Sequence, residues 1–304
     1  MKDEIELSAG RIEYDDTGPA DSGGRHPSAT IVLLHGLAMN SSVWRHVIED
    51  LRRDYRCIAP TLPLGGHRYP MRPDADLSMQ GQVRLIAEFL ERLDLDDVTL
   101  VGNDWGGALV LVSDGLAQRV GRLVISSCEA FDNYPPGLPG RTVWLAGKLP
   151  GGLNALVQPL RIRSLRRLPN ALGRMSKRPI PDEITDSWLE PALTQRAVRR
   201  DVAKYVRSLR KDEFIRAAER LADLGFDRPV LILWASEDRV MPPDHGRRLA
   251  DLFPRGRYVE ISDSYTLIPE DQPGEFAAQV RAFITATTTE GNAGLSDDRT
   301  LDGG

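Results

Sequence analysis

Two hydrophobic rhythms alternate along most of the chain. The first consists of short, unbroken apolar runs, which are typical of strands buried on both faces of a parallel sheet. The second places apolar residues three and four positions apart, as in amphipathic helices. The predicted strands are Thr30–Leu34, Cys57–Pro60, Val98–Val101, Leu123–Ser127, Pro229–Trp234 and Tyr258–Ile261, and the predicted helices include Ser42–Asp54, Met79–Leu93, Asp244–Leu252 and Pro273–Ile284. This alternation predicts an α/β fold with a mostly parallel sheet and helices on both faces.

The beginning, the middle and the end of the chain depart from this alternation. Glu4–Leu7 and Arg11–Tyr14 alternate apolar with polar residues, which predicts an antiparallel hairpin and brings the sheet to eight strands. Residues 132–224 are rich in proline, glycine and arginine and carry short helical patterns without a buried-strand run. We therefore expect a core domain of residues 1–131 and 225–287, a helical cap of residues 132–224 and a disordered tail of residues 288–304.

The composition narrows the function classes. The 304 residues carry a net charge of −5, which gives no reason to expect nucleic acid or an anionic membrane as a partner. Cys57 and Cys128 have no metal-like or CxxC spacing, so we expect buried thiols in a reducing compartment. The N-terminal residues lack the apolar segment of a signal peptide, and no stretch approaches the ~20 apolar residues of a membrane helix. We expect a cytoplasmic protein, a monomer or a homodimer.

The motifs of the chain point to a small-molecule substrate. No phosphate-binding loop, metal-ligand cluster or dinucleotide fingerprint occurs in the sequence, so we expect no cofactor and no metal. A basic cluster in the predicted cap has two interpretations, a solvated helix face or a site for an anionic carrier or substrate. Its members are Arg161, Arg163, Arg166, Arg167, Arg174, Lys177 and Arg178.

The stretch VTLVGNDWGG, residues 98–107, predicts a sharp turn from a strand to a helix. Small residues at Gly102, Gly106 and Gly107 suit such a turn, whose central residue stands exposed at the carboxyl edge of the sheet. The central residue is Asp104, where the G-x-S-x-G form of this turn carries a nucleophilic serine. An ordinary helix N-cap is the alternative role of this aspartate.

Other chemically active side chains follow the predicted parallel strands. His35 follows the strand of residues 30–34, and Glu129, Asp238 and the pair Tyr265 and Thr266 follow three later strands. Ligands of open parallel sheets bind beyond the carboxyl ends of the strands, where these residues should meet. Each acidic residue alone could be a surface charge or a helix cap, but their coincidence at one edge favours a functional site.

The order of HGL (35–37), GNDWGG (102–107), the helical insertion and SED (236–238) resembles the α/β-hydrolase superfamily. The resemblance is strongest to the epoxide hydrolases and haloalkane dehalogenases, whose nucleophile is an aspartate, and it covers roughly Ile5 to Ile284. It implies that Asp104 attacks an electrophilic carbon and forms an ester. It also implies an oxyanion hole made by the backbone N–H groups of Leu37 and Trp105.

The resemblance places the supporting acid at Asp238, with Glu129 as the second candidate. It fails at the histidine: the family's D-x-G-H-F-x-x-x-E-x-P loop reads DSYTLIPEDQP here, with Tyr265-Thr266 in place of Gly-His. A threonine hydroxyl is a poor base near neutral pH, so an ester on Asp104 lacks its usual route to hydrolysis.

Three functions therefore remain open at the level of sequence. The first is a hydrolase of a largely apolar substrate, an epoxide or ester rather than a haloalkane, with a carboxylate as nucleophile or as base. The second is a non-hydrolytic enzyme such as a cyclase, isomerase or lyase, and the third is a non-catalytic binder. Substrate contacts are expected from His35, Tyr134, Trp144, Trp188 and Tyr205.

Overall fold

The structure is a computed structural model that describes residues 2–20 and 29–297. Its eight strands form one sheet in the order β1-β2-β4-β3-β5-β6-β7-β8. The strands β3 to β8 run parallel to one another, and β1 and β2 add an antiparallel edge beside β4. The strands are β1 (Lys2–Leu7), β2 (Gly10–Asp16), β3 (Thr30–Leu34), β4 (Arg56–Pro60), β5 (Val98–Asn103), β6 (Val120–Ser126), β7 (Val230–Ala235) and β8 (Gly256–Ile261). The predicted eight-stranded, mostly parallel sheet is confirmed.

The centre of the sheet explains the unbroken apolar runs. Every residue of β5 and of β7 is buried, whereas in each of the edge strands β1 and β8 only the last residue is buried. Central strands are covered by helices on both faces, so neither face needs polar side chains. Cys57 and Cys128 are buried free thiols, as the sequence predicts.

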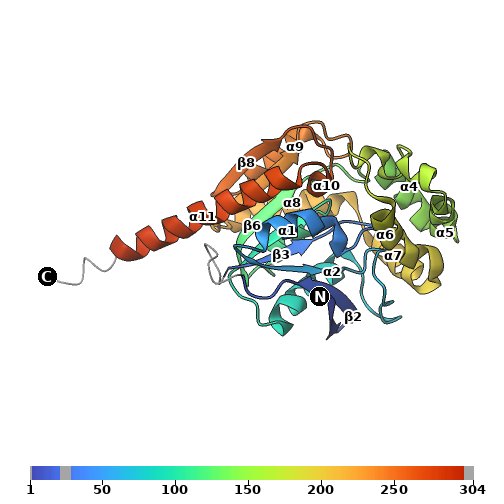
Figure 1. The fold of residues 1–304 in the computed structure, drawn as a ribbon, viewed down its shortest axis with the longest axis horizontal. Coiled ribbons are helices and arrows are strands. Elements are labelled where there is room, and N and C mark those ends of the chain that lie inside the picture. The colour runs from blue at the N-terminus through green and yellow to red at the C-terminus, as the bar shows by residue number, and fades with distance from the viewer. Residues whose placement is uncertain (1, 21–28, 298–304) are drawn as a thin grey trace.

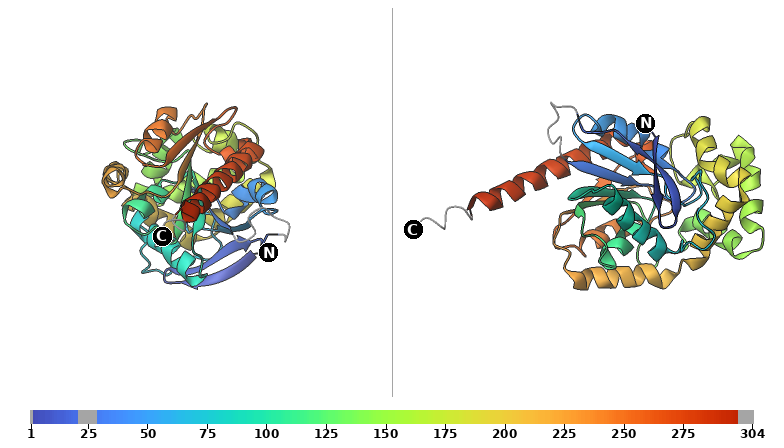
Figure 2. Two further views of the ribbon diagram at one scale, coloured as in Figure 1. Left: turned by 90° about the vertical axis from the view of Figure 1, so that its left-hand side faces the viewer. Right: turned by 90° about the horizontal axis from the view of Figure 1, so that it is seen from below.

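Helices cover both faces of the sheet and fill one end of it. The α-helices of the described residues are α1 (Arg45–Leu51), α2 (Met79–Arg92), α3 (Gly107–Ser113), α4 (Gly137–Lys148), α5 (Gly152–Val157), α6 (Asp182–Thr194), α7 (Arg196–Ser208), α8 (Lys211–Leu224), α9 (Pro243–Ala250), α10 (Ile268–Asp271) and α11 (Pro273–Asp297). On one face α1 packs against α11, and on the other α2 and α8 pack against α3 (Figures 1 and 2). Ser78 caps α2 by accepting the Gly81 N–H, as its sequence pattern suggests.

The chain between β6 and β7 forms a helical insert beyond one end of the sheet (Figure 1). Helices α4 to α7 pack on one another there. They are joined by the single-turn helices η2 (Gln158–Arg161), η3 (Arg163–Arg167) and η4 (Leu172–Arg174), and a further one, η1 (Ser41–Trp44), precedes α1. The last helix of residues 132–224, α8, instead runs back along the sheet against α3, because its buried side chains Phe214, Ala217 and Leu221 join the main core.

The C-terminal end differs from the expected disordered tail. Helix α11 continues past residue 287 to Asp297 and projects away from the sheet on the side opposite the insert (Figure 2). The run of small and threonine residues after Ile284 does not break the helix, and four threonine hydroxyls donate to carbonyls three or four residues earlier. Residues 298–304 lie outside the described part. Across residues 2–20 and 29–297 no helix is long and apolar enough to cross a membrane.

Candidate active site

The turn after β5 places Asp104 at the carboxyl edge of the sheet. Asp104 has a positive φ of 55° and lies between the last strand residue, Asn103, and helix α3. Its N–H donates to the Ser127 carbonyl (3.0 Å), which fastens the turn to the end of β6. A Cβ atom at Gly36 would collide with the Asp104 backbone and side chain, so this close approach requires glycine. The predicted turn is therefore present, with its carboxyl facing a cavity.

This cavity measures ≈ 380 Å³ and lies between the sheet edge and the insert. Its floor includes Leu37, Ala38 and Met39 after β3 and Leu267 after β8, and most of its wall comes from apolar residues of the insert. Asp104 and Glu129 are the carboxyl side chains of the lining, within the residues that the structure describes. Apolar wall residues of the insert include Pro136, Val143, Leu156, Leu160, Leu165, Leu168, Leu172, Met175 and Leu189.

Asp104 and Glu129 form an electrostatically coupled pair. Burial raises the pKa of Asp104 well above its usual range, and the negative charges of Glu129 and then Asp238 raise it further. Burial raises the pKa of Glu129 to about 6, against the opposing effect of the Gly106 N–H, which donates to its Oε2 (2.9 Å). Both pKa values are therefore raised at the same edge of the cavity, and repulsion between the two carboxylates disfavours the state in which both are ionised.

Asp238 does not line this cavity and is tied to its own loop. Its Oδ1 accepts the N–H groups of Val240 (2.9 Å) and Met241 (2.8 Å) and the hydroxyl of Thr266 (2.8 Å). Its Oδ2 is buried and has no partner within the described chain. Burial raises the pKa of Asp238 despite these three bonds. Thr266, which is fully buried, thus donates to this acid, but its hydroxyl is a poor general base.

Tyr265 lies beside the cavity rather than in its lining. Its ring stacks under the guanidinium of Arg239, 4.3 Å from the ring centroid, and its N–H donates to Asp271 (2.9 Å). The two residues at the family's Gly-His position therefore point in different directions. Thr266 points to Asp238, and Tyr265 packs against Arg239.

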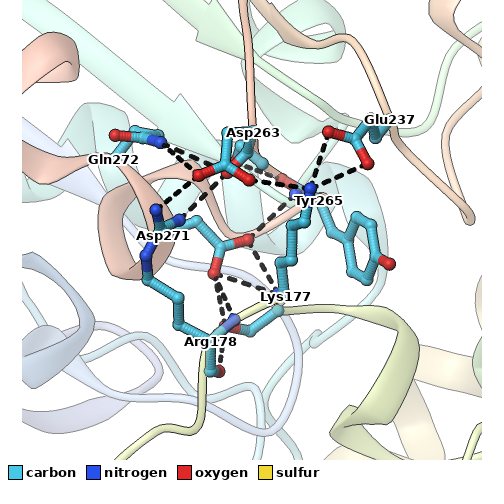
Figure 3. A network of polar contacts seen from close by, with 9 residues as sticks. Lys177, Arg178, Glu237, Asp263, Tyr265, Asp271 and Gln272 are labelled. Carbon is cyan, nitrogen blue, oxygen red and sulfur yellow. Dashed lines mark hydrogen bonds and ion pairs between the residues drawn. The ribbon is translucent and has the colours of Figure 1, made fainter.

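Asp271 is the centre of a polar network that joins the insert to the loop after β8 (Figure 3). It accepts the N–H groups of Lys177 and Arg178 as well as the Ser176 hydroxyl. The side chains of Lys177 and Arg178 form ion pairs with Asp263 (2.7 and 2.6 Å), and Lys177 also pairs with Glu237. These contacts hold one wall of the cavity against the loop that carries Thr266.

Residues 29–273 match the family described as the alpha/beta hydrolase fold. The chain belongs to this family. Among its relatives, haloalkane dehalogenase 2 of Mycobacterium tuberculosis is 27% identical over 296 residues, which cover 91% of this chain and 92% of the relative. A 2-hydroxy-6-oxononadienedioate/2-hydroxy-6-oxononatrienedioate hydrolase of Cupriavidus pinatubonensis is 27% identical over 257 residues, 81% of each chain. A cis-3-alkyl-4-alkyloxetan-2-one decarboxylase of Xanthomonas campestris is 26% identical over 292 residues, 90% of this chain and 92% of the relative.

Solved structures agree on the fold. The crystal structure of a haloalkane dehalogenase from Bradyrhizobium elkani superposes with a TM-score of 0.75 at 18% identity, covering 95% of this chain and 99% of that one. An esterase from Thermogutta terrifontis superposes with a TM-score of 0.67 at 19% identity, covering 94% and 99%. At these identities the likeness shows the fold alone.

In this α/β hydrolase the expected oxyanion-hole residues flank Asp104. Neither the Leu37 nor the Trp105 backbone N–H donates to another group of the described residues. The indole N–H of Trp105 is already used, because it donates to the Tyr205 hydroxyl (2.9 Å) in the core. Both backbone N–H groups thus lack a protein acceptor within the described residues, and Leu37 lines the cavity, whereas Trp105 does not.

The five residues expected to contact substrate lie outside the cavity lining. Buried His35 donates from Nδ1 to the Gly36 carbonyl (2.7 Å) and accepts the Leu62 N–H at Nε2 (2.8 Å), and burial lowers its pKa to about 4. Trp188 is buried and donates to Ser42, whereas Trp144 lies under the Lys148 ammonium. Tyr134 packs on Phe214. Together with Tyr205, which accepts from Trp105, these side chains have structural partners instead.

Sequence reasoning missed the part played by Asp271 and most of the residues that line the cavity. The sequence signal for Asp271 was the DQP stretch, residues 271–273, at the end of the divergent loop. This stretch contains an acidic residue to which the sequence assigns no partner. Many of the wall residues lie on the single-turn helices η2 to η4 and in the loops between them, which offer no periodic signal. No group of three or more potential metal ligands occurs among the residues that the structure describes.

Proposed function

We propose that this α/β hydrolase adds water to a compact, largely apolar epoxide, with Asp104 and Glu129 as an acid–base pair. The observation that carries the proposal is the apolar cavity of ≈ 380 Å³, whose lining includes two carboxyls, Asp104 and Glu129, with pKa values that burial raises. A carboxyl with a raised pKa is suited to donating a proton, and a neighbouring carboxylate can accept one in the same reaction.

The reaction needs one proton donor and one proton acceptor. The protonated Asp104 donates to the epoxide oxygen as its bond to carbon breaks, and a water oxygen forms the new bond to that carbon. The Glu129 carboxylate takes the proton that this water loses. The product is a vicinal diol, and transfer of the proton from Glu129 back to Asp104, through water, restores the pair. No ester forms in this route, so the route does not need a histidine at residue 266 to activate water for ester hydrolysis.

Other features of the site support this substrate class. Dehalogenation needs donors for a leaving halide, and the Trp105 indole N–H is bonded to Tyr205. The relatives' names span dehalogenation, hydrolysis of a dienedioate and decarboxylation of an oxetanone, so they support hydrolase chemistry without selecting a substrate. We infer that helices α4 to α7 act as the cap that excludes water from the cavity, since most of its wall comes from the insert.

A second route uses Asp104 as the nucleophile, as the family resemblance suggests. The strained turn, with φ 55° at Asp104, and the unbonded N–H groups of Leu37 and Trp105 favour it. In this route Glu129 or Asp238 must activate the water that cleaves the ester. The cytoplasmic location, the monomeric or homodimeric state and the lack of nucleic-acid or membrane partners stay predictions.

Single-turnover hydrolysis of styrene oxide in ¹⁸O-labelled water distinguishes the two routes. With enzyme in excess, the acid–base route places the label in the diol at the first turnover. The nucleophile route places it in the Asp104 carboxyl, where mass spectrometry of the peptide detects it, and leaves the first diol unlabelled. With Glu129→Gln, intact mass should reveal no adduct in the first route and an accumulating ester in the second. Failure to form diol from any of a series of apolar epoxides would contradict the proposed function.

A further inference from the structure

A second pocket lies directly behind the wall of the active-site cavity. It measures ≈ 240 Å³ and is lined by five cationic side chains, Arg163, Arg166, Arg167, Lys177 and Arg178. Five of the seven members of the basic cluster in the sequence thus surround one hollow. The lining contains no aromatic side chain, so it offers nothing on which a nucleobase could stack.

Residues 163–178 form the partition between the two pockets. Leu165, Leu168 and Met175 face the apolar cavity, whereas five of the six cationic side chains of the same segment, all but Arg174, line the basic pocket. Leu172 lines both pockets, so in this place a single side chain separates them. The helices of this segment are the single-turn helices η3 and η4, so the partition is one layer of short turns.

Most of the cations in the basic pocket already have carboxylate partners. Arg163 and Arg166 pair with Asp186 (2.7 and 2.6 Å), and Arg163 also reaches Asp182. Lys177 and Arg178 pair with Asp263 in the network of Figure 3. The resulting charges nearly cancel, so the pocket does not suit a polyanion.

Arg167 is the exception in this pocket. It is exposed, and its guanidinium has no hydrogen bond or ion pair with any residue in the described part of the chain. One unpaired guanidinium, set among four neutralised cations, matches a single carboxylate in charge and in its bidentate geometry.

We propose that the substrate is a monocarboxylate amphiphile whose apolar, epoxide-bearing chain fills the cavity and whose carboxylate binds Arg167 in the basic pocket. The proposal rests on the proposed function for the chemistry and on the partition for the orientation. The chain passes the wall at Leu172, which both pockets share. Arg167 is then a specificity residue that acts in binding and takes no part in proton transfer.

Paired substrates test the proposal. A series of terminal epoxides with an ω-carboxylate, and the matching ω-alcohols, are compared at each chain length. At the chain length that spans the two pockets, the acid should show a KM about 10-fold lower than the alcohol, as expected for one accessible charge-assisted hydrogen bond. Arg167→Gln should remove this preference and leave kcat/KM for the alcohol unchanged. The preference should also weaken with added salt.

The matched control is Arg161→Gln, which removes the same charge from η2, the single-turn helix that precedes the partition. Arg161 donates to Gln158 and to the Leu193 carbonyl and does not line the basic pocket. This variant should keep the acid preference. Equal KM values for acid and alcohol in the wild-type enzyme, or equal losses in the two variants, would overturn the proposal.

A binding measurement separates this inference from the proposed function. Calorimetric titration with decanoate and with decanol needs no turnover. Decanoate should bind the wild-type protein more tightly than decanol, and Arg167→Gln should bind both alike. If no epoxide is hydrolysed but the decanoate preference is present and depends on Arg167, the proposed reaction fails and the carboxylate site stands. If neutral epoxides are hydrolysed without an acid preference, the reaction stands and the carboxylate site fails.

Discussion

Two buried aspartates, Asp104 after β5 and Asp201 in α7, have opposite electrostatic surroundings. Asp201 is fully buried and accepts the Met71 N–H (2.8 Å), the Nε2–H of His67 (3.3 Å) and the Arg200 guanidinium (2.7 Å). Burial alone would raise the pKa of Asp201, but these bonds outweigh it and the pKa lies below its usual value. Through these contacts Asp201 holds helix α7 of the insert against the loop after β4.

The Asp104 carboxyl has no protein donor among the described residues and faces two other acids. Burial therefore acts on its pKa without compensation and raises it. A carboxyl buried without donors costs stability, and the cavity in front of it gives a ligand or water access to the same oxygens. Burial alone therefore does not distinguish a structural aspartate from a reactive one. The distinguishing feature is the number of hydrogen-bond donors that reach the carboxylate.

The largest effect should follow from Asp104→Asn. The amide cannot donate a proton as an acid does, so kcat/KM for an epoxide should fall by about 10²- to 10⁴-fold. The free energy of unfolding at neutral pH should not decrease, because a carboxyl without donors is replaced by a neutral group. Steady-state kinetics and urea denaturation check the two expectations. An active Asp104→Asn enzyme would remove Asp104 from the chemistry altogether.

The reverse outcome is expected at Asp201. Asp201→Ala leaves Arg200 and the Met71 N–H without their acceptor, and it should lower the free energy of unfolding by about 3 kcal/mol. Turnover per folded molecule should change far less than in Asp104→Asn. Asp212→Ala, which breaks an exposed ion pair with Arg216 at 2.7 Å, is the control and should cost less than about 1 kcal/mol. Equal losses at Asp201 and Asp212 would show that the buried network does not stabilise the insert.

The two environments should also give pH dependences of opposite sign. The pKa of Glu129 rises from 4.5 to about 6 on folding, so its favourable contribution is complete below pH 4.5 and is lost as the pH rises through 6. Relative to Glu129→Gln, the wild-type protein should therefore become less stable between these values. The lowered pKa of Asp201 acts the other way: its contribution is complete above 3.8 and is lost as the pH falls through the folded value. Urea denaturation from below pH 3.8 to above pH 6 measures how the free energy of unfolding depends on pH for each residue. Slopes of the same sign for Glu129 and Asp201 would contradict the opposite pKa shifts of these two residues.

The predictability of the site from sequence follows the same division. Asp104, Glu129, Asp238 and Thr266 could be placed because the carboxyl ends of parallel strands converge, and strands are read from local apolar runs. The contact of Asp201 with His67 could not, because these residues are 134 positions apart in the chain and no local pattern links them.

The orientation of individual side chains also could not be predicted from the sequence. His35 follows a strand as the site residues do, yet both ring nitrogens bond to the backbone of its own and a neighbouring loop. Tyr265 turns away because Arg239 covers its ring. The helix that extends to Asp297 shows the same limit, since a polar, aperiodic stretch predicted no regular structure there.

The smallest effect, and the one that best tests the role of the divergent loop, is expected from Thr266→Val. The change keeps the shape of the side chain and removes the hydroxyl that donates to Asp238 (2.8 Å), whose Oδ1 keeps two backbone donors. The free energy of unfolding should fall by about 1 kcal/mol, the usual contribution of one buried hydrogen bond. In the acid–base route kcat should change less than about 10-fold, because Asp104 and Glu129 carry the protons. A loss of kcat as large as that of Asp104→Asn would instead place Asp238 and Thr266 in the chemical step. Asp238 would then belong with the reactive carboxyls, although three donors reach its Oδ1.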